Sequence, residues 1–475
     1  MGVSFLYSEG IFMKVKFEEF YGNSDSITLN VTNNCNLTCS YCFETDKTRA
    51  MMPPEIAIEA IKKAYSPNDS NMMPYTINFF GGEPLLNWKT IKAVIDYCNE
   101  NHLKVQYGFT TNLTILTEEI LDYMDDNSIP FLVSIDGIKQ VHDKNRCNSY
   151  DTVMKNLKRI IDRGLGIYIE TRITVLPEDV KYLFQGIKEL YDMGLNNFCP
   201  IPVSDVEWSD EHLKELEEFY SQITDFFIEE MSKEDNTRNL SIKNVDDLFR
   251  VMALPEVYDH FTCSIFDKRW FCVDYRGDVY ACHQGPTSNE EIKEMLYIGN
   301  LDWIDDEKYY NRITHTNFVK PECDGCNAKC ICKCGCPVEN LRETREYTKP
   351  TDAYCDIKRV TLKAVSSKIQ DIIDIKHSNN RALTVTQENL KIKVYVDKVY
   401  EEFINRDIDD LYMVQLATQI DHIQEMMDNL KNSIMDNFKE YIDGKLTNLL
   451  AILLTMNGVS YNQLEEVINN GNKNS

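Results

Sequence analysis

The sequence predicts an α/β fold built on a parallel sheet. Strand-like runs alternate with helical patterns along the first half of the chain. Because a helix separates each strand from the next, neighbouring strands are expected to run parallel with right-handed crossovers, in either an open six-stranded barrel or a doubly wound sheet. The predicted strands are 27–31, 76–80, 104–110, 130–135, 166–174 and 196–201, and the predicted helices are 54–64, 88–100, 117–124, 151–161, 177–193 and 210–231.

Composition excludes several classes of protein. At 475 residues with 43% hydrophobic content, the chain is long enough for two or three globular domains. The net charge of −26 argues against a nucleic-acid partner, which requires clustered basic residues, and indicates an acidic surface or, alternatively, attraction of a cationic peptide. There is no apolar run of the roughly 18 residues that would span a membrane. The N-terminus lacks an export signal, which predicts a cytoplasmic protein.

Sixteen cysteines are an unusual number for a cytoplasmic chain, and they indicate metal binding rather than disulfides. Three of them, Cys35, Cys39 and Cys42, lie within eight residues directly after the first predicted strand. A [4Fe–4S] cluster is usually held by four thiolates, so three on one loop would leave one iron open. Zinc is the alternative, but this spacing is not usual for a zinc ribbon.

Small polar residues follow the next predicted strands. Two glycines at a strand end let the backbone approach a ligand closely, and carboxyl ends of parallel strands meet at one edge of a sheet. Each residue alone is equally compatible with simple turn chemistry. The residues in this series are Gly81, Gly82, Glu83, Thr111, Asn112, Ser134 and Asp136.

The cysteine loop after the first strand, with an aromatic residue before its last cysteine, resembles the signature of radical S-adenosylmethionine (SAM) enzymes. The resemblance implies a partial (β/α)6 TIM-like barrel. It also implies that the open iron binds SAM and that an electron from the cluster, supplied by reduced flavodoxin or ferredoxin, yields a 5′-deoxyadenosyl radical. Cys35, Cys39 and Cys42 would be the cluster ligands, and therefore central to catalysis.

The same resemblance implies contacts to SAM. Tyr41 would lie near the adenine, and the Gly81-Gly82-Glu83 element would bind the amino group. Arg172, and with it Arg146, would reach the carboxylate. The ribose and methionine part would be lined by Thr111, Asn112, Ser134 and Asp136.

A second group of seven cysteines matches the SPASM pattern, which carries two auxiliary [4Fe–4S] clusters and so implies three clusters in all. A predicted hairpin at 273–280, with glycine in the turn, would bring flanking cysteines together. The auxiliary cluster nearer the active site would have only three ligands from this pattern. Either Cys272 would be its fourth ligand, or a substrate thiolate would bind its open iron. By resemblance the distal ligands are Cys323, Cys326, Cys332 and Cys355, and the near ones are Cys263, Cys282 and Cys336.

Five cysteines are not among these predicted cluster ligands. Cys330 and Cys334 interleave the second group and are interpreted as spare. Cys98, Cys147 and Cys199 are interpreted as buried small hydrophobes, although Cys199 sits at the end of the last strand, where substrate would lie.

The Cys-His-Gln run at 282–284 resembles maturases of cysteine-rich ribosomal peptides, of the ranthipeptide and sactipeptide type, more than sulfatase maturases, which carry an acidic residue after that cysteine. His283 is a candidate catalytic base or a structural histidine. The implied function is thioether formation in a small ribosomal precursor peptide. The alternatives are formylglycine formation, carbon–carbon crosslinking, epimerisation, or a non-catalytic iron–sulfur electron-transfer protein.

The predicted organisation is an N-terminal segment at 1–24, a radical SAM core at 25–235, a linker at 236–260, a SPASM domain at 261–358 and a helical extension at 359–475. The extension has apolar residues at helical intervals and patches rich in methionine. It is interpreted as a packed helical bundle or, alternatively, as an adaptable groove for a leader peptide.

Overall fold

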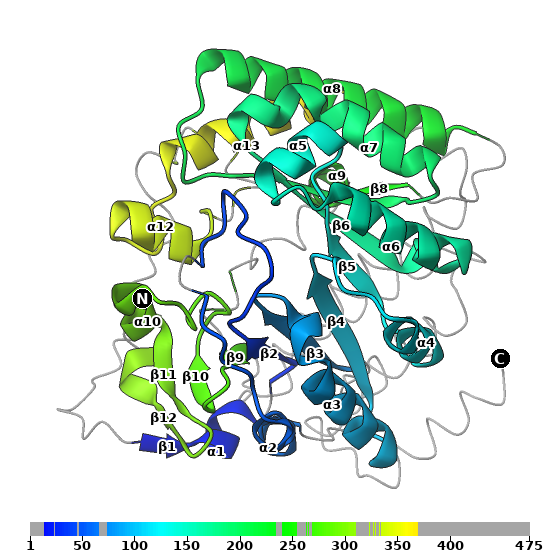
Figure 1. Ribbon diagram of the computed structural model, residues 1–475. Helices are drawn as coiled ribbons and strands as arrows, with labels where there is room; N and C mark the ends of the chain where they lie inside the picture. Colours follow the sequence, from blue (N-terminus) through cyan, green and yellow to red (C-terminus); the bar gives the residue numbers. More distant parts are fainter. Residues whose placement is uncertain are drawn as a thin grey trace, which may run out of the picture. The chain divides into compact units, whose positions relative to one another are not determined.

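The computed structural model (Figure 1) describes the chain between residues 14 and 368 with gaps at 23, 45–46, 66–73, 234–239, 254–262, 264, 266–267, 310–322, 324–325, 327, 329–331 and 333. Cys330 and most of the predicted helical extension lie outside the described residues. One compact unit contains the described residues up to 230, 240–248 and 263–368, and a second contains 231–233 and 249–253.

The predicted parallel sheet is confirmed. Seven strands pair in parallel and in chain order. They are β2 (Ser26–Thr32), β3 (Tyr75–Gly81), β4 (Val105–Thr111), β5 (Phe131–Ser134), β6 (Ile169–Val175), β7 (Asn197–Pro202) and β8 (Ser241–Ile242).

Five further strands extend this sheet beyond β2. The strand β9 pairs in parallel with β2, with Ile27 opposite Phe271, and the remaining strands follow as antiparallel neighbours in the order β10, β11, β12 and β1. They are β1 (Lys14–Lys16), β9 (Trp270–Val273), β10 (Asp278–Tyr280), β11 (Tyr297–Asn300) and β12 (Trp303–Asp305). The predicted hairpin is therefore present, with Gly277 in its turn at a φ of 84°.

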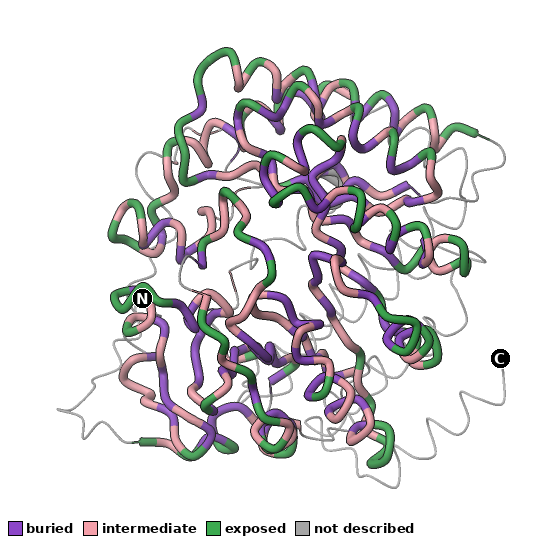
Figure 2. The backbone as a smooth tube through the Cα atoms, viewed as in Figure 1, coloured by how far each residue is buried: buried purple, intermediate pink, exposed green. Residues whose placement is uncertain are grey.

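Helices lie along the outer side of the parallel strands (Figure 1), and buried residues concentrate on the strands and on the helix faces toward them (Figure 2). The helices are α1 (Phe17–Tyr21), α2 (Pro54–Ala64), α3 (Trp88–Glu100), α4 (Glu118–Asp126), α5 (Lys139–Asn145), α6 (Tyr150–Asp162), α7 (Leu183–Asp192), α8 (Asp210–Met231), α9 (Lys243–Ala253), α10 (Glu290–Leu296), α12 (Pro337–Thr344) and α13 (Asp352–Ser366), with 3-10 turns η1 (Pro84–Asn87), η2 (Leu165–Tyr168) and η3 (Pro177–Tyr182).

Three predicted helices, 54–64, 88–100 and 210–231, have the observed bounds. The predicted strand at 166–174 begins only at Ile169, because the turn η2 follows the left-handed Gly164. The predicted helix at 177–193 is divided into η3 and α7. The short helix α5 was not predicted, since its seven residues give too little periodicity to detect.

Strand β6 shows how the sheet separates core from site. Its residues alternate between buried ones, such as Ile173, and half-buried ones, such as Arg172. Because side chains alternate across a strand, the half-buried set lies on the face opposite the core. Arg172 is paired with Ser134 on β5 and with Cys199 on β7, so these three share one face of the sheet.

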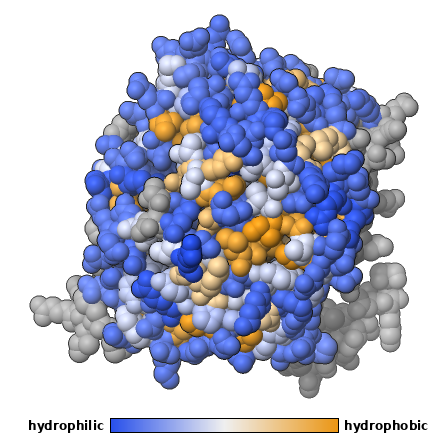
Figure 3. All heavy atoms as spheres, viewed as in Figure 1, coloured by the Kyte–Doolittle hydropathy of each residue, from blue (hydrophilic) through white to orange (hydrophobic). Residues whose placement is uncertain are grey.

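The surface is largely hydrophilic, with apolar side chains gathered near the middle of the face viewed in Figure 3. No helix among the described residues is long and apolar enough to cross a membrane.

Candidate functional site

The cluster loop, residues 35–42, follows β2 at the carboxyl end of the sheet and lies directly against the end of β3. A Cβ atom on Gly82 would lie 2.2 Å from the Asn34 carbonyl oxygen and 3.0 Å from the Cys35 Cβ. Gly81 has a φ of 136°, and a Cβ there would lie 2.1 Å from the Thr32 carbonyl oxygen. Both glycines are therefore required for this close approach.

The end of β4 holds one side of the cluster loop. The Asn112 Nδ2 donates to the Asn36 Oδ1 at 3.0 Å and lies 3.9 Å from the Cys35 Sγ. The Asn36 Nδ2 in turn donates to the Thr114 Oγ1 at 2.7 Å. Asn112, predicted from its position after a strand, thus contacts the loop itself.

The last residue of α5 and the two residues after it, 145–147, hold the other side of the loop. The Ser40 backbone N–H donates to the Asn145 carbonyl oxygen at 3.0 Å, and the Ser40 hydroxyl donates to the Asn145 Oδ1 at 3.1 Å. The Thr38 backbone N–H donates to the Cys147 Sγ at 3.2 Å. These contacts, which sequence reasoning missed, join residues over 100 positions apart.

Tyr41 of the cluster loop forms a polar group with the buried residues Asp136 and Arg146. The Tyr41 hydroxyl donates to the Asp136 Oδ2 at 2.5 Å, and the Arg146 Nε donates to the same oxygen at 3.0 Å. The Arg146 guanidinium also lies 5.3 Å from the centre of the Tyr41 ring. Burial raises the pKa of Tyr41, so its hydroxyl remains a donor. Burial opposes the charge of Arg146, but Asp136 outweighs it and raises the pKa of Arg146 above its usual range.

The three thiols of the loop are free and influence one another. Burial raises the pKa of Cys39 to about 11, against the opposing charge of Arg146, and burial also raises the pKa of Cys35. Cys42 raises the pKa of both. Since iron binds the thiolate, cluster binding at this loop would release protons.

This donor set fits a [4Fe–4S] cluster. The loop supplies three thiols within electrostatic reach of one another, as the cluster requires. Within the described ranges, no three His, Cys, Asp or Glu side chains converge in the manner that a single metal ion requires. A cube differs from such a site because each thiolate binds a separate iron.

Glu83 is fully buried and joins the ends of β3 and β4. Its carboxylate accepts hydrogen bonds from the Leu85 N–H at 3.1 Å, the Thr111 hydroxyl at 2.8 Å and the Asn112 N–H at 2.7 Å. Burial raises the pKa of Glu83 to about 7, although these three donors oppose the shift. Contacts of Glu83 and Thr111 with SAM remain predictions.

His283 approaches the face of the sheet that carries Arg172. Its ring lies 4.6 Å from the Phe80 ring and 5.6 Å from the Trp270 ring, centre to centre. Burial, together with the charge of Arg172, lowers the pKa of His283 to about 4. The imidazole is therefore neutral near pH 7, as a proton acceptor must be.

The predicted near-cluster cysteines lie together. Burial raises the pKa of Cys282, and both Cys336 and Cys263 raise it further. Cys272 is fully buried, and burial together with Cys282 raises its pKa well above the usual value. The Gln284 Nε2 lies 3.7 Å from the Cys336 Sγ.

The predicted distal ligands also lie together. Burial raises the pKa of Cys355 to about 11, and three thiols add to this effect: Cys332, Cys323 and Cys326. A hydrogen bond from Cys334 lowers the pKa of Cys332 to about 6. Cys334, interpreted as spare, therefore contacts a predicted ligand.

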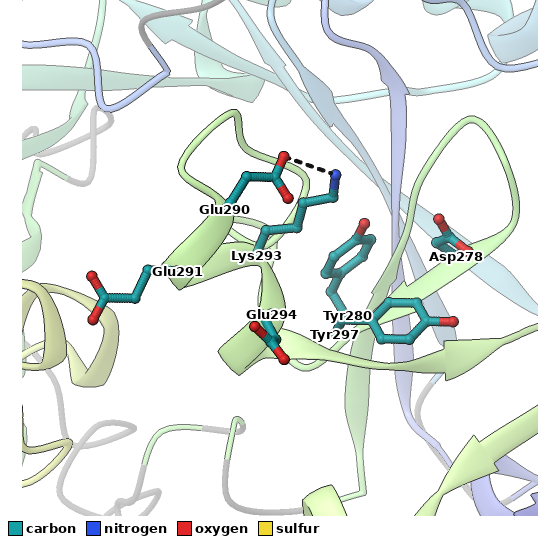
Figure 4. Close-up of a pocket in the computed structure, with 7 residues that line it drawn as sticks. All are labelled: Asp278, Tyr280, Glu290, Glu291, Lys293, Glu294 and Tyr297. Atoms are coloured by element: carbon teal, nitrogen blue, oxygen red, sulfur yellow. Dashed lines mark hydrogen bonds and ion pairs between the residues drawn. The ribbon is translucent and has the colours of Figure 1, made fainter.

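The cysteines outside these groups differ in burial. Cys98 and Cys199 are buried, as expected for small hydrophobes, whereas Cys147 is exposed. An open pocket of about 520 Å³ contains none of the predicted site residues (Figure 4). It is lined by Asp278, Tyr280, Glu290, Glu291, Lys293, Glu294 and Tyr297.

Comparison with known proteins identifies a matching family model and relatives that match part of the chain. The family model described as the Radical SAM superfamily matches residues 29–191. An uncharacterized protein of Methanocaldococcus jannaschii is 34% identical over 36% of this chain and 60% of its own length. The radical SAM cyclopropyl synthase TigE of Paramaledivibacter caminithermalis is 34% identical over 28% of this chain and 32% of its own length. The chain thus spans less than two thirds of either relative.

Longer matches have lower identity. A cysteine-type anaerobic sulfatase-maturating enzyme of Clostridium novyi is 24% identical over 64% of this chain and 85% of its own length. The solved structure of native anSMEcpe with bound AdoMet and Cp18Cys peptide superposes with a TM-score of 0.60 at 19% identity, covering 74% of this chain and 98% of that one. This likeness shows a shared fold.

Proposed function

We propose that the protein is an enzyme that cleaves SAM and uses the radical to modify a peptide, since the family model described as the Radical SAM superfamily matches residues 29–191. The observation that carries this proposal is the cluster loop itself. Three thiols sit on one loop, and the ends of β3, β4 and β5 contact that loop through Gly82, Asn112 and Asp136.

Each group of residues has a proposed task. When bound, the cluster and SAM supply a 5′-deoxyadenosyl radical. Cys35, Cys39 and Cys42 hold the cluster. Arg172 binds the SAM carboxylate. Its guanidinium makes no hydrogen bond or ion pair with any residue that the structure describes, and its half-buried side chain shares a face with Ser134. The remaining predicted contacts to SAM are those of Tyr41, Gly81, Gly82, Glu83, Thr111, Asn112, Ser134, Asp136 and Arg146.

A peptide substrate is supported by the names of similar proteins. The Clostridium novyi relative is described as a sulfatase-maturating enzyme, and the anSMEcpe structure holds a peptide. We propose a small ribosomal precursor peptide for this chain, processed in the cytoplasm, with reduced flavodoxin or ferredoxin as electron donor.

The proposed product is a Cys-derived thioether. The radical removes one hydrogen atom from a substrate carbon, and a substrate thiol loses its proton as its sulfur bonds to that carbon. One electron is left over, and an auxiliary cluster accepts it. The grouping of Cys282 with Cys336 and Cys263 supports a nearby cluster for that purpose. His283 is the proposed acceptor of the thiol proton, a role that requires its pKa to rise well above about 4 when the substrate is bound.

Formylglycine formation is the second candidate, favoured by the match to 85% of the Clostridium novyi enzyme. The two products differ in mass. A thioether costs the peptide two hydrogens and blocks a thiol, whereas formation of formylglycine from cysteine replaces the sulfur with oxygen and also removes two hydrogens. Crosslinking between carbons also costs two hydrogens but leaves every thiol free, and epimerisation changes no mass.

The deciding experiment incubates a candidate precursor peptide with anaerobically reconstituted, reduced protein and SAM. We expect 5′-deoxyadenosine together with a peptide that is two hydrogens lighter and has lost one alkylatable thiol. The Cys35→Ala variant should form neither product. If wild-type protein forms no 5′-deoxyadenosine, the chain is better described as an electron-transfer protein.

A further inference from the structure

We infer that residues 145–147 form a clamp that fixes the conformation of the cluster loop and so positions its thiols for the cluster. This inference rests on the proposed function, because it assigns a role in holding the SAM-binding cluster. It concerns positioning residues, which would act through the loop rather than on substrate.

Three consecutive residues of the clamp contact three non-cysteine residues of the loop. Asn145 accepts both hydrogen bonds of Ser40, and Cys147 accepts the Thr38 N–H. Arg146 covers the Tyr41 ring. The clamp therefore engages the loop on both sides of Cys39, the middle ligand.

The clamp is itself fixed to the ends of two strands. The Arg146 Nε donates to Asp136, just beyond β5, and an Asp136 oxygen accepts the Thr174 N–H of β6 at 3.3 Å. The Asn145 Nδ2 donates to the Asp179 Oδ2 at 2.8 Å. Asn145 and Arg146 are 1% and 6% exposed, so these bonds are shielded from water.

This rigidity has a thermodynamic consequence. A loop that must be ordered when its cluster binds loses conformational entropy at that step, whereas a loop already held by the fold does not. Outer-shell partners of metal ligands affect metal affinity by about 10–100-fold. Clamp contacts that do not touch the iron should therefore slow the loss of the cluster.

The test uses two variants, a Ser40→Ala/Cys147→Ala double variant and Arg146→Gln, with Cys98→Ala as control. Cys98 is a buried thiol of α3 outside both cysteine groups. Each holoprotein is exposed anaerobically to an iron chelator without SAM. Samples taken over time are reduced, and the part of the electron paramagnetic resonance signal that changes on adding SAM is measured.

We expect the SAM-responsive signal to decay about tenfold faster in the double variant, and up to about a hundredfold faster in Arg146→Gln. The other signals and the melting temperature of the double variant should match those of Cys98→Ala. Cys147→Ser in the Ser40 wild-type background should stay near the wild-type rate, because the serine oxygen still accepts the Thr38 N–H.

Equal decay rates in the double variant and the control would overturn the clamp, and so would parallel loss of all signals, which would indicate a general structural defect. Each decay is expressed relative to the SAM-responsive signal of the same variant before the chelator is added, so a weakened contact to SAM lowers the starting amplitude and not the rate. A wild-type protein without any SAM-responsive signal would instead count against the proposed function.

Discussion

At the scale of single residues, Gly82 and Glu83 adjoin at the end of β3 and serve the cluster loop in different ways. Gly82 leaves room for the loop, since any Cβ would meet the backbone of Asn34. Glu83 spans to the next strand through Thr111 and Asn112, and Asn112 in turn contacts Cys35. A two-residue sequence thus sets both the distance and the orientation of the thiol loop.

Gly82→Ala is expected to abolish stable binding of the cluster at the loop, because a methyl group 2.2 Å from a carbonyl oxygen forces the backbone of residues 34–35 to move. Gly166→Ala is the matched control, since its nearest neighbour would lie at 3.4 Å. Iron analysis should find about four fewer irons per chain in the first variant only. Full iron content in Gly82→Ala would contradict the proposed close packing.

Glu83 predicts a pH dependence of stability. Its folded pKa of about 7 exceeds the ordinary 4.5 of glutamate, so the folded state holds this proton more tightly than the unfolded state. The resulting contribution to stability is complete below about pH 4.5 and is lost as pH rises through about 7. By linkage it amounts to about 3 kcal/mol.

The difference in melting temperature between wild type and Glu83→Gln should therefore shrink, or change sign, from pH 5 to pH 8. The control variant Glu55→Gln, at an exposed residue, should have the same melting temperature as wild type at every pH. Parallel curves for wild type and Glu83→Gln would mean that the buried carboxyl group is not the source of the dependence.

At the scale of elements, the N-terminal cap of α13 holds the helix that carries a predicted cluster ligand. The Thr351 hydroxyl accepts the Tyr354 N–H at 3.1 Å and donates to the Ser204 carbonyl oxygen at 2.7 Å. It thereby begins the helix that carries Cys355 and anchors that helix to the segment after β7.

Thr351→Ala should lower stability by about 1 kcal/mol and also reduce occupancy of the distal cluster. Thr117→Ala is the matched control, because Thr117 caps α4 in the same way through the Ile120 N–H. We expect a similar fall in melting temperature for both variants, but loss of iron only for Thr351→Ala. Equal iron contents in the two variants would show that the α13 cap does not affect binding of the distal cluster.

Element by element, the sequence allowed prediction of what depends on local periodicity. Helices α2, α3 and α8 have strong amphipathic patterns and were predicted with their observed bounds. The pairing of β9 with β2 could not be predicted, because it joins segments over 240 residues apart and leaves no local signal. For the same reason the motifs identified the thiols but not Asn145 and Cys147, whose contacts with the loop are purely tertiary.

At the scale of the whole molecule, the eleven cysteines predicted as ligands fall into three groups. If each proposed group binds one cluster, holoprotein should contain about twelve irons per chain. Replacing the three loop cysteines by alanine should leave about eight, and the remaining clusters should still be reducible by dithionite. A wild-type content near four would reject both auxiliary clusters.

The twelve-stranded sheet joins the strand before the cluster loop and the hairpin of β9 and β10 in one hydrogen-bonded framework. The strand before Cys35 and the strand that carries Cys272 are direct neighbours, with Thr28 opposite Cys272. Backbone ladders do not stretch, so the separation between the loop and the hairpin is set by strand spacing and does not depend on a hinge. If the enzyme passes an electron from substrate to an auxiliary cluster in each turnover, the distance of that transfer would then be constant. The rate of electron transfer would be insensitive to motions elsewhere in the chain.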